Sequence, residues 1–325
     1  MSQFPKSINR HKIVLVGTGA VGATFAYAST LLGVGQELVI VDVARDRAQG
    51  NALDLADALR FTDPKNIYAG DYKDAADADI VVITAGAAQK PGESRIDLIS
   101  RNLQITKSIV TQVMESGFNG IFLLASNPVD ILTYLTRKLS GFPAERVIGS
   151  GTSLDTSRLC KHVATLLQVS PHSVNGYMLG EHGDSGFAAW SHLSVGGKTM
   201  EEWMKADSRI TQDKLDDIQN QVVNAAYEII RLKGATYYGI GTALARLCKA
   251  ILNDEGAVLP VSAYINGQYD IKDIYIGTPA VLDRQGIRQV IEIPLNAREQ
   301  ALMTASAEKL HEIMRTSFPS IGLEH

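Results

Sequence analysis

Short runs of apolar residues recur along the first 150 residues. These runs lie at 12–16, 38–43, 80–84, 120–124 and 147–149. Near-continuous apolar runs of this length are typical of strands buried on both faces of a parallel sheet. The segments after the first two runs, 21–32 and 45–59, predict helices, and the later runs repeat the order. Strands that alternate with helices predict a doubly wound parallel sheet.

The regular alternation of predicted strands and helices ends at about residue 150. Helices are expected at 153–167, 214–232 and 296–317, and strands at 174–179 and 188–195. The segment 257–293 predicts several short strands, broken by Gly267, Gly277 and Gly286, which favours antiparallel pairing. Asn296 followed by Glu299 has the spacing of an N-terminal helix cap.

Composition excludes several classes of protein. A chain of 325 residues can form two domains, and its net charge of −4 argues against a nucleic-acid partner. No apolar run approaches the roughly 18 residues of a membrane span, and the first residues do not resemble a signal peptide. Cys160 and Cys248 lack metal or redox spacing. We therefore expect a cytoplasmic protein with no membrane association and no metal site.

A glycine-rich loop follows the first predicted strand. Gly17, Gly19 and Gly22 have the spacing that permits a tight turn, a close approach to a pyrophosphate and close packing of helix on strand. The amino end of the following helix then faces the negative charge. Asp42 ends the second strand, where an acid binds the ribose hydroxyls of NAD. A Rossmann-type NAD-binding domain is therefore expected over residues 1–150.

Candidate chemistry for a small acid lies beyond residue 150. His182, in the run Gly-Glu-His-Gly-Asp at 180–184, titrates near neutrality and suits proton transfer. Asp155 is a candidate to fix its tautomer, although the sequence alone does not bring the two together. Arg158 shares a helical face with Asp155, so it is either a local ion pair or a fork for a substrate carboxylate. We expect residues 151–325 to form a mixed α+β substrate domain.

Two loops follow predicted strands at the edge where open α/β sheets bind ligands. The loop 86–95 carries Gln89 and Arg95, and is either a connector or a segment that closes over a substrate. Asn127, in Asn-Pro-Val-Asp at 127–130, has an amide able to orient a carbonyl or hydroxyl group.

In these motifs, their order and their spacing, the chain resembles the bacterial L-lactate dehydrogenases of the lactate/malate dehydrogenase family over nearly its full length. Matching segments include the glycine loop, Gln-Lys-Pro-Gly-Glu-Ser-Arg at 89–95, Gly-Glu-His-Gly-Asp at 180–184 and Lys-Gly-Ala-Thr at 233–236. The resemblance implies His182 as proton donor, Asp155 as its partner, Arg158 as carboxylate clamp and Arg95 as a polarising residue. It implies Asn127 and Thr236 as substrate contacts, and a homotetramer.

The resemblance also implies a set of cofactor contacts. With those named above, the expected NAD-binding residues are Gly17, Gly19, Val21, Gly22, Asp42, Arg47, Tyr72, Gly86, Ala87, Ser108, Ala125, Ser126, Asn127 and Ser150.

Three positions bear on substrate and regulation. Related malate dehydrogenases have an arginine where this chain has Gln89, and a neutral amide favours pyruvate over a dicarboxylate. Many bacterial relatives bind fructose 1,6-bisphosphate through an arginine and a histidine, at whose positions this chain has Cys160 and Asn175. We therefore expect no activation by that sugar. The stretch 185–189 also departs from the family's usual sequence.

The expected reaction is the reversible NADH-dependent reduction of pyruvate to L-lactate, as in fermentation after glycolysis. A dehydrogenase for larger 2-keto acids is a close alternative. An NAD-dependent glycosidase and a non-catalytic NAD sensor are more distant ones, since the first needs a divalent metal and the second leaves the histidine and arginine without a task.

Overall fold

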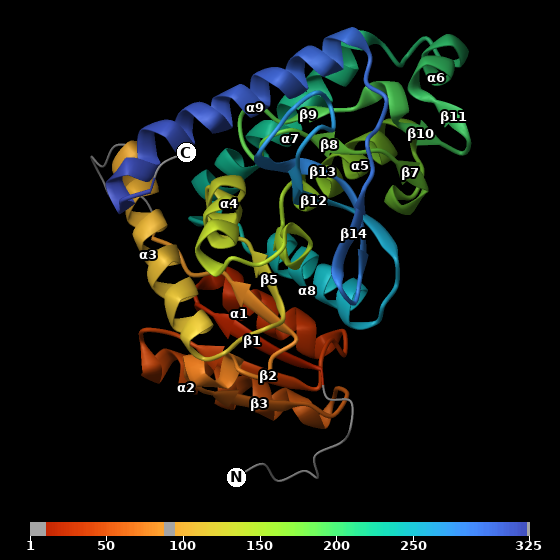
Figure 1. The fold of residues 1–325 in the computed structure, drawn as a ribbon. Coiled ribbons are helices and arrows are strands. Elements are labelled where there is room, and N and C mark those ends of the chain that lie inside the picture. The colour runs from red at the N-terminus through yellow and green to blue at the C-terminus, as the bar shows by residue number, and fades with distance from the viewer. Residues whose placement is uncertain (1–10, 88–94, 324–325) are drawn as a thin grey trace.

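A single nine-stranded sheet forms the centre of the molecule, and helices cover both of its faces (Figure 1). The structure is a computed structural model that describes residues 11–87 and 95–323. Along the sheet the strand order is β14-β13-β12-β6-β5-β4-β1-β2-β3. The sheet is continuous across residue 150, because β12 pairs antiparallel with β6.

Six parallel strands make up the amino-terminal part of this sheet. They are β1 (Lys12–Val16), β2 (Glu37–Val41), β3 (Asn66–Ala69), β4 (Ile80–Ile83), β5 (Ile121–Leu124) and β6 (Val147–Gly149). Their spatial order, 3-2-1-4-5-6, is that of a doubly wound nucleotide-binding sheet, and it reverses between β1 and β4. The predicted fold class is confirmed.

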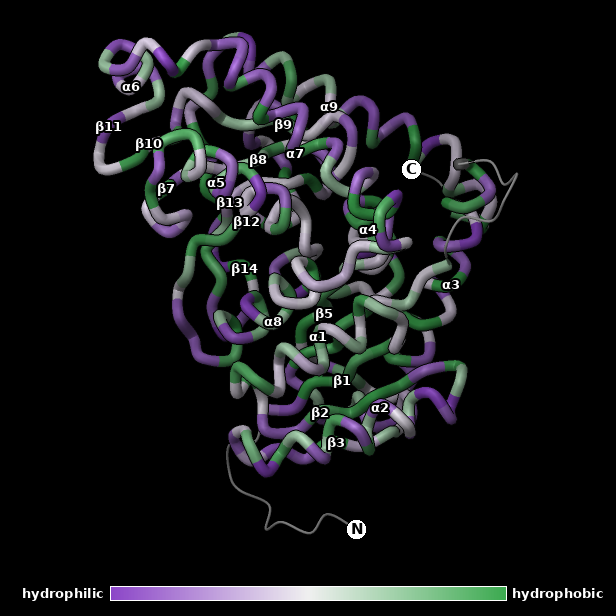
Figure 2. The backbone as a smooth tube through the Cα atoms, turned by 180° about the vertical axis from the view of Figure 1, so that it is seen from behind, coloured by the Kyte–Doolittle hydropathy of each residue, from purple (hydrophilic) through white to green (hydrophobic). Residues whose placement is uncertain are grey.

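Alternate residues of each buried strand face opposite helical layers. Ile13 and Leu15 pack with α1 (Ala20–Leu31), α2 (Arg45–Asp57) and α8 (Tyr238–Leu252). Val14 and Val16 pack with α3 (Arg95–Glu115), α4 (Val129–Ser140) and α9 (Ala297–Ser317). Both sets of side chains are shielded from solvent, which explains why the strand sequences are almost continuously apolar. Figure 2 shows these hydrophobic runs along β1 and β2.

Three antiparallel strands extend the sheet: β12 (Ala257–Ile265), β13 (Ile274–Asp283) and β14 (Gly286–Val290). The predicted antiparallel pairing is confirmed, but Gly277 does not break a strand, because β13 runs through it. A side chain at Gly277 would meet Thr152 and the carbonyl oxygen of Gly180, so glycine here permits a close approach of backbones.

The remaining helices and strands form the end of the molecule farthest from β2 and β3 (Figure 1). They are α5 (Ser153–Leu167), β7 (Val174–Asn175), β8 (Met178–Leu179), β9 (Phe187–Ala188), β10 (Ser194–Val195), β11 (Lys198–Thr199), α6 (Met200–Ala206) and α7 (Gln212–Lys233). The strands expected at 174–179 and 188–195 are therefore pairs of short strands rather than continuous ones. The cap of α9 is as predicted, with Asn296 and Glu299 forming a capping box. No helix in the described part of the chain is both long and apolar enough to cross a membrane.

Candidate active site

The glycine loop joins β1 to α1 at the carboxyl edge of the sheet. Gly17 has a φ of +97°, and a Cβ there would lie 2.6 Å from the main-chain nitrogen of Ala85. A Cβ on Gly22 would collide with the carbonyl oxygen of Gly17, so this glycine lets α1 pack on the loop. A Cβ on Gly19, by contrast, would meet nothing within 4 Å. Gly19 thus borders open space at the amino end of α1, where a pyrophosphate fits.

A cavity of about 530 Å³ lies beside this loop. Seven predicted cofactor residues line it: Gly17, Gly19, Asp42, Arg47, Tyr72, Gly86 and Ser108. Of the others, Val21 and Gly22 lie in α1, Ala87 follows Gly86, Ala125 to Asn127 follow β5, and Ser150 follows β6. All of these sit after the carboxyl ends of parallel strands or in the helix beside them, as expected for a dinucleotide site.

Asp42 holds the loop together as well as facing the cavity. Its carboxylate accepts hydrogen bonds from the N–H and hydroxyl of Thr18 (2.7 and 2.8 Å), from Ala44 N–H (2.8 Å) and from Arg47 Nη2 (2.8 Å). Burial raises the pKa of Asp42, but these donors reverse the effect, and the pKa falls below its ordinary value. An ionised acid at this place suits ribose hydroxyls and repels a phosphate.

His182, Asp155 and Arg158 form one hydrogen-bonded set. Nδ1 of His182 lies 2.6 Å from Asp155 Oδ2, and Arg158 Nη1 donates to Asp155 Oδ1 at 3.0 Å. Asp155 therefore bridges an imidazole and a guanidinium that are 24 residues apart in the sequence. Among the residues that the structure describes, Asp155 is the sole hydrogen-bond partner of the Arg158 guanidinium, which leaves most of its N–H groups for an anion.

The set is electrostatically tuned for a charged imidazole. Burial lowers the pKa of His182, but the charge of Asp155 and its hydrogen bond more than offset this, so the pKa of His182 is raised. Burial raises the pKa of Asp155, whereas His182 and Arg158 lower it, and the net change is downward. The two shifts agree: Asp155 is ionised and favours protonated His182.

A second buried carboxylate contacts the same histidine. Asp130 accepts a hydrogen bond from the His182 N–H (2.9 Å) and from the Ser262 hydroxyl (2.5 Å). Burial raises the pKa of Asp130 to about 6, against the lowering effect of Ser262 and His182. The sequence motif that contains Asp130 was recognised, but this contact was missed because no local pattern encodes it.

The carboxyl edge also links the two predicted loops. Asn102 of α3 accepts from the Ala87 N–H (2.8 Å) and donates to the carbonyl oxygen of Asn127 (2.9 Å). Asn102 was not predicted, although it is a buried polar residue in a helix. Thr236 lies between α7 and α8, outside the His182 set. Arg95 begins α3, and Gln89 lies outside the described residues.

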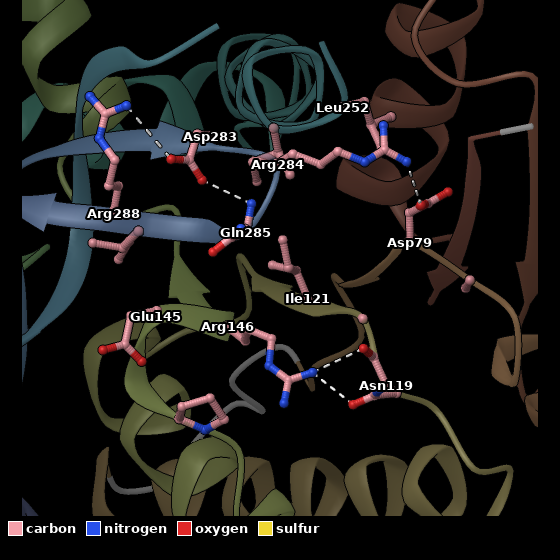
Figure 3. A pocket seen from close by; sticks show the side chains of 15 residues that line it. Asp79, Asn119, Ile121, Glu145, Arg146, Leu252, Asp283, Arg284, Gln285 and Arg288 are labelled. Atoms are coloured by element: carbon pink, nitrogen blue, oxygen red, sulfur yellow. Dashed lines mark hydrogen bonds and ion pairs between the residues drawn. The ribbon is translucent and has the colours of Figure 1, made fainter. Parts of the chain in front are cut away.

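A larger cavity, of about 740 Å³, lies elsewhere (Figure 3). Its walls come from residues that precede or begin β4, β5 and β6, from the end of α8 and from the turn between β13 and β14. The cavity therefore lies at the opposite edge of the sheet. Figure 3 shows that its arginines do not converge: Arg284 is directed at Asp79, and Arg146 at Asn119. Without converging donors, this cavity is a poorer candidate for the chemistry than the carboxyl edge.

Comparison with known protein families assigns both halves of the chain to one family. Residues 11–149 match the model for the lactate/malate dehydrogenase NAD binding domain, and residues 152–320 match that for the lactate/malate dehydrogenase alpha/beta C-terminal domain. The chain belongs to the lactate/malate dehydrogenase family. It is an NAD-dependent oxidoreductase, and the cavity beside the glycine loop fits that cofactor.

Individual relatives agree with this assignment. The chain is 56% identical over 316 residues to an L-lactate dehydrogenase of Lacticaseibacillus casei, covering 97% of each chain. It is 57% identical over 314 residues to L-lactate dehydrogenase 1 of Lactobacillus johnsonii, again covering 97% of each. The structure of the minor L-lactate dehydrogenase from Enterococcus mundtii in its ligands-bound form superposes with a TM-score of 0.93 at 50% identity, over 94% of this chain and 98% of that one.

Proposed function

We propose that this protein reduces pyruvate to L-lactate with NADH, reversibly and without activation by fructose 1,6-bisphosphate. The observation that carries the proposal is the Asp155 carboxylate, which joins a histidine with a raised pKa to a guanidinium that has N–H groups to spare. A proton donor and a carboxylate clamp at one place suit a small 2-keto acid.

Each residue then has a task. Arg158 binds the substrate carboxylate through its planar fork, which orients the keto group toward His182. Protonated His182 donates a proton from Nε2 to the keto oxygen, because Nδ1 is engaged with Asp155. Asp155 stabilises the imidazolium, and in lactate oxidation the neutral imidazole accepts the proton. The glycine loop and Asp42 would hold the cofactor, which when bound as NADH would supply the hydride for the carbonyl carbon.

The two predicted loops and the segment between α7 and α8 complete the proposed site. Arg95 polarises the keto oxygen, while Asn127 and Thr236 contact the substrate. Gln89 offers no positive charge to a second carboxylate, which favours pyruvate over oxaloacetate.

Independence from the sugar bisphosphate rests on Cys160 and Asn175. The Cys160 thiol donates to the carbonyl oxygen of Val174 (3.7 Å), so the two positions are close in space. Burial raises the pKa of Cys160 to about 11, and Asn175 carries no charge, so neither attracts a phosphate near neutral pH.

An NADH absorbance assay with a panel of keto acids tests the proposal. Pyruvate should give a higher kcat/KM than oxaloacetate or 2-ketoisocaproate, and fructose 1,6-bisphosphate should leave the half-saturating pyruvate concentration unchanged. A preference for oxaloacetate would contradict the substrate assignment. A large fall in the half-saturating concentration on adding the sugar would contradict the assignment of Cys160 and Asn175.

We further propose two domains, residues 1–150 for NAD and residues 151–325 for substrate, in a cytoplasmic homotetramer. Large exposed apolar side chains support self-association, among them Tyr27 and Leu31 of α1 and Leu53 of α2. Light scattering on the purified protein should give four times the chain mass of 35.1 kDa, and a monomer would contradict this assignment.

A further inference from the structure

His182 lies in a short segment, 180–186, that three elements hold in place. Gly180 exchanges two main-chain hydrogen bonds with Gly277 of β13, at 3.1 and 2.9 Å. The His182 N–H donates to Asp130 at the start of α4. On the side of α9, the Glu181 N–H donates to the Ser306 hydroxyl at 2.7 Å. The location of the imidazole therefore depends on α9 as well as on the sheet.

The strongest contact between this segment and α9 is an ion pair. Glu181 is only 5% exposed, and its Oε2 accepts from Lys309 Nζ at 2.7 Å. The same oxygen accepts from the Ser185 hydroxyl at 2.5 Å and from the Ser185 N–H at 3.3 Å. A buried carboxylate is unfavourable unless it is paired and hydrogen-bonded, so loss of Lys309 would leave Glu181 to seek another position.

Glu181 and His182 use separate partners although they are neighbours. The Glu181 carboxylate contacts Lys309 and Ser185, whereas the His182 imidazole contacts Asp155. The ion pair therefore acts on His182 through the backbone rather than by touching the ring. The charges that shift the pKa of His182 come from Asp155, Asp130 and Arg158, and Glu181 acts on this set only through Asp130, whose pKa it raises.

We propose that the Glu181–Lys309 ion pair is a positioning pair that fixes the 180–186 segment, and with it Nε2 of His182 against the substrate carbonyl. This inference rests on the proposed function. A misplacement of about 1 Å in a reacting group can reduce the rate about 100-fold. Since β13, α4 and the Ser306 hydroxyl of α9 still hold the segment, we expect the loss of the pair to slow hydride transfer by about 10-fold. Removal of either member of the pair should have this effect.

Two substitutions test the pair. Lys309→Met removes the ammonium group and keeps a long side chain, and Glu181→Gln keeps an oxygen acceptor for Ser185 and removes the charge. Each should lower the single-turnover rate per NADH-binding site, raise the primary deuterium isotope effect and leave NADH affinity unchanged. Lys309→Met, which keeps the charge of Glu181, should also leave the midpoint of the pH profile unchanged. The double variant should be no slower than either single variant, and Lys309→Arg should recover most of the rate.

A matched lysine provides the control. Lys107 of α3 donates to the carbonyl oxygen of Ile321 at 3.0 Å, and so attaches the C-terminal segment at a place that does not touch 180–186. Lys107→Met should leave the rate per site unchanged. If it slowed turnover as much as Lys309→Met, general loosening of the C-terminal segment would be the cause and the inference would be wrong.

Chemical modification tests the position of His182 independently of catalysis. In the protein without cofactor, Lys309→Met should raise the rate at which diethyl pyrocarbonate modifies His182 severalfold, as followed by mass spectrometry. An unchanged modification rate, or full activity per NADH-binding site in Lys309→Met, would overturn the inference. Failure of the proposed function would instead appear in the unsubstituted protein, as a lack of pyruvate reduction, while the modification experiment would still decide the role of the pair.

Discussion

Substitution of Asp155 by asparagine tests the electrostatics of the site most informatively. In the structure Asp155 accepts from Arg158 at one oxygen and from His182 Nδ1 at the other. An asparagine has one oxygen and one NH₂ group. Because Arg158 can only donate, the amide oxygen must face Arg158 and the NH₂ group must face His182. Nδ1 then has to accept, which requires a neutral imidazole with its proton on Nε2.

The expected magnitude follows from the lost bond. A hydrogen bond to a charged group contributes about 1.5–3 kcal/mol, which corresponds to about a 10- to 150-fold change. We therefore expect kcat/KM for pyruvate near neutral pH to fall by about 10- to 150-fold in Asp155→Asn. Lactate oxidation should also slow, because the forced tautomer places a proton on the nitrogen that has to accept one.

The pH dependence of kcat/KM should shift in a definite direction in Asp155→Asn. Pyruvate reduction needs protonated His182, so kcat/KM falls as pH rises through the pKa of that residue, which Asp155 raises. Without the carboxylate, this decline should occur at lower pH. Stopped-flow measurement of NADH oxidation across pH, with Asn175→Asp as a control that adds a carboxylate away from the set, makes the test. A decline at the same pH in Asp155→Asn would show that Asp155 does not raise the pKa of His182.

Four further substitutions have definite expected outcomes. Gly19→Ala should fold normally but weaken NADH binding measured by fluorescence, whereas Gly22→Ala should lose about 1–3 kcal/mol of stability in urea titration, because its Cβ meets main-chain atoms of the loop; equal stability of the two variants would contradict this. Asp42→Ser should free the Arg47 guanidinium and shift the kcat/KM preference toward NADPH by about 10- to 150-fold, and an unchanged preference would count against Asp42 as the discriminating acid. Arg158→Lys should raise the KM for pyruvate by about 10-fold or more with a smaller effect on kcat, since a lysine cannot form the two-pronged contact; an unchanged KM would remove Arg158 from the clamp role.

How far the fold could be predicted depended on burial. The run 12–16 coincides with β1, because every residue of that strand is buried and hence apolar. The edge strand β3 was missed, since its four residues are only half-buried and its sequence lacks an apolar run. Helix α8 was also missed, although it is largely buried between α1 and β13. Gly277 was misread as a strand end because sequence does not distinguish a turn from a close approach of two backbones.

In the candidate site, local contacts could be predicted from the sequence and tertiary contacts could not. The contact between Asp155 and Arg158 follows from helical spacing, so local pattern predicted it. The contact between Asp155 and His182 spans 27 residues and came only from family resemblance. The contacts of Asp130 and Lys309 with the histidine segment were missed, because tertiary packing alone creates them. Gln89, on which the choice of pyruvate largely depends, lies outside the described residues.

The proposed reaction requires His182 as the proton donor. The decisive measurement is the single-turnover rate of NADH oxidation by pyruvate in His182→Ala, at saturating substrate and with NADH binding checked independently. General acid catalysis contributes about 10²–10⁴-fold, so the rate should fall by at least about 100-fold while NADH still binds. A rate near that of the unsubstituted protein would show that His182 is not the proton donor.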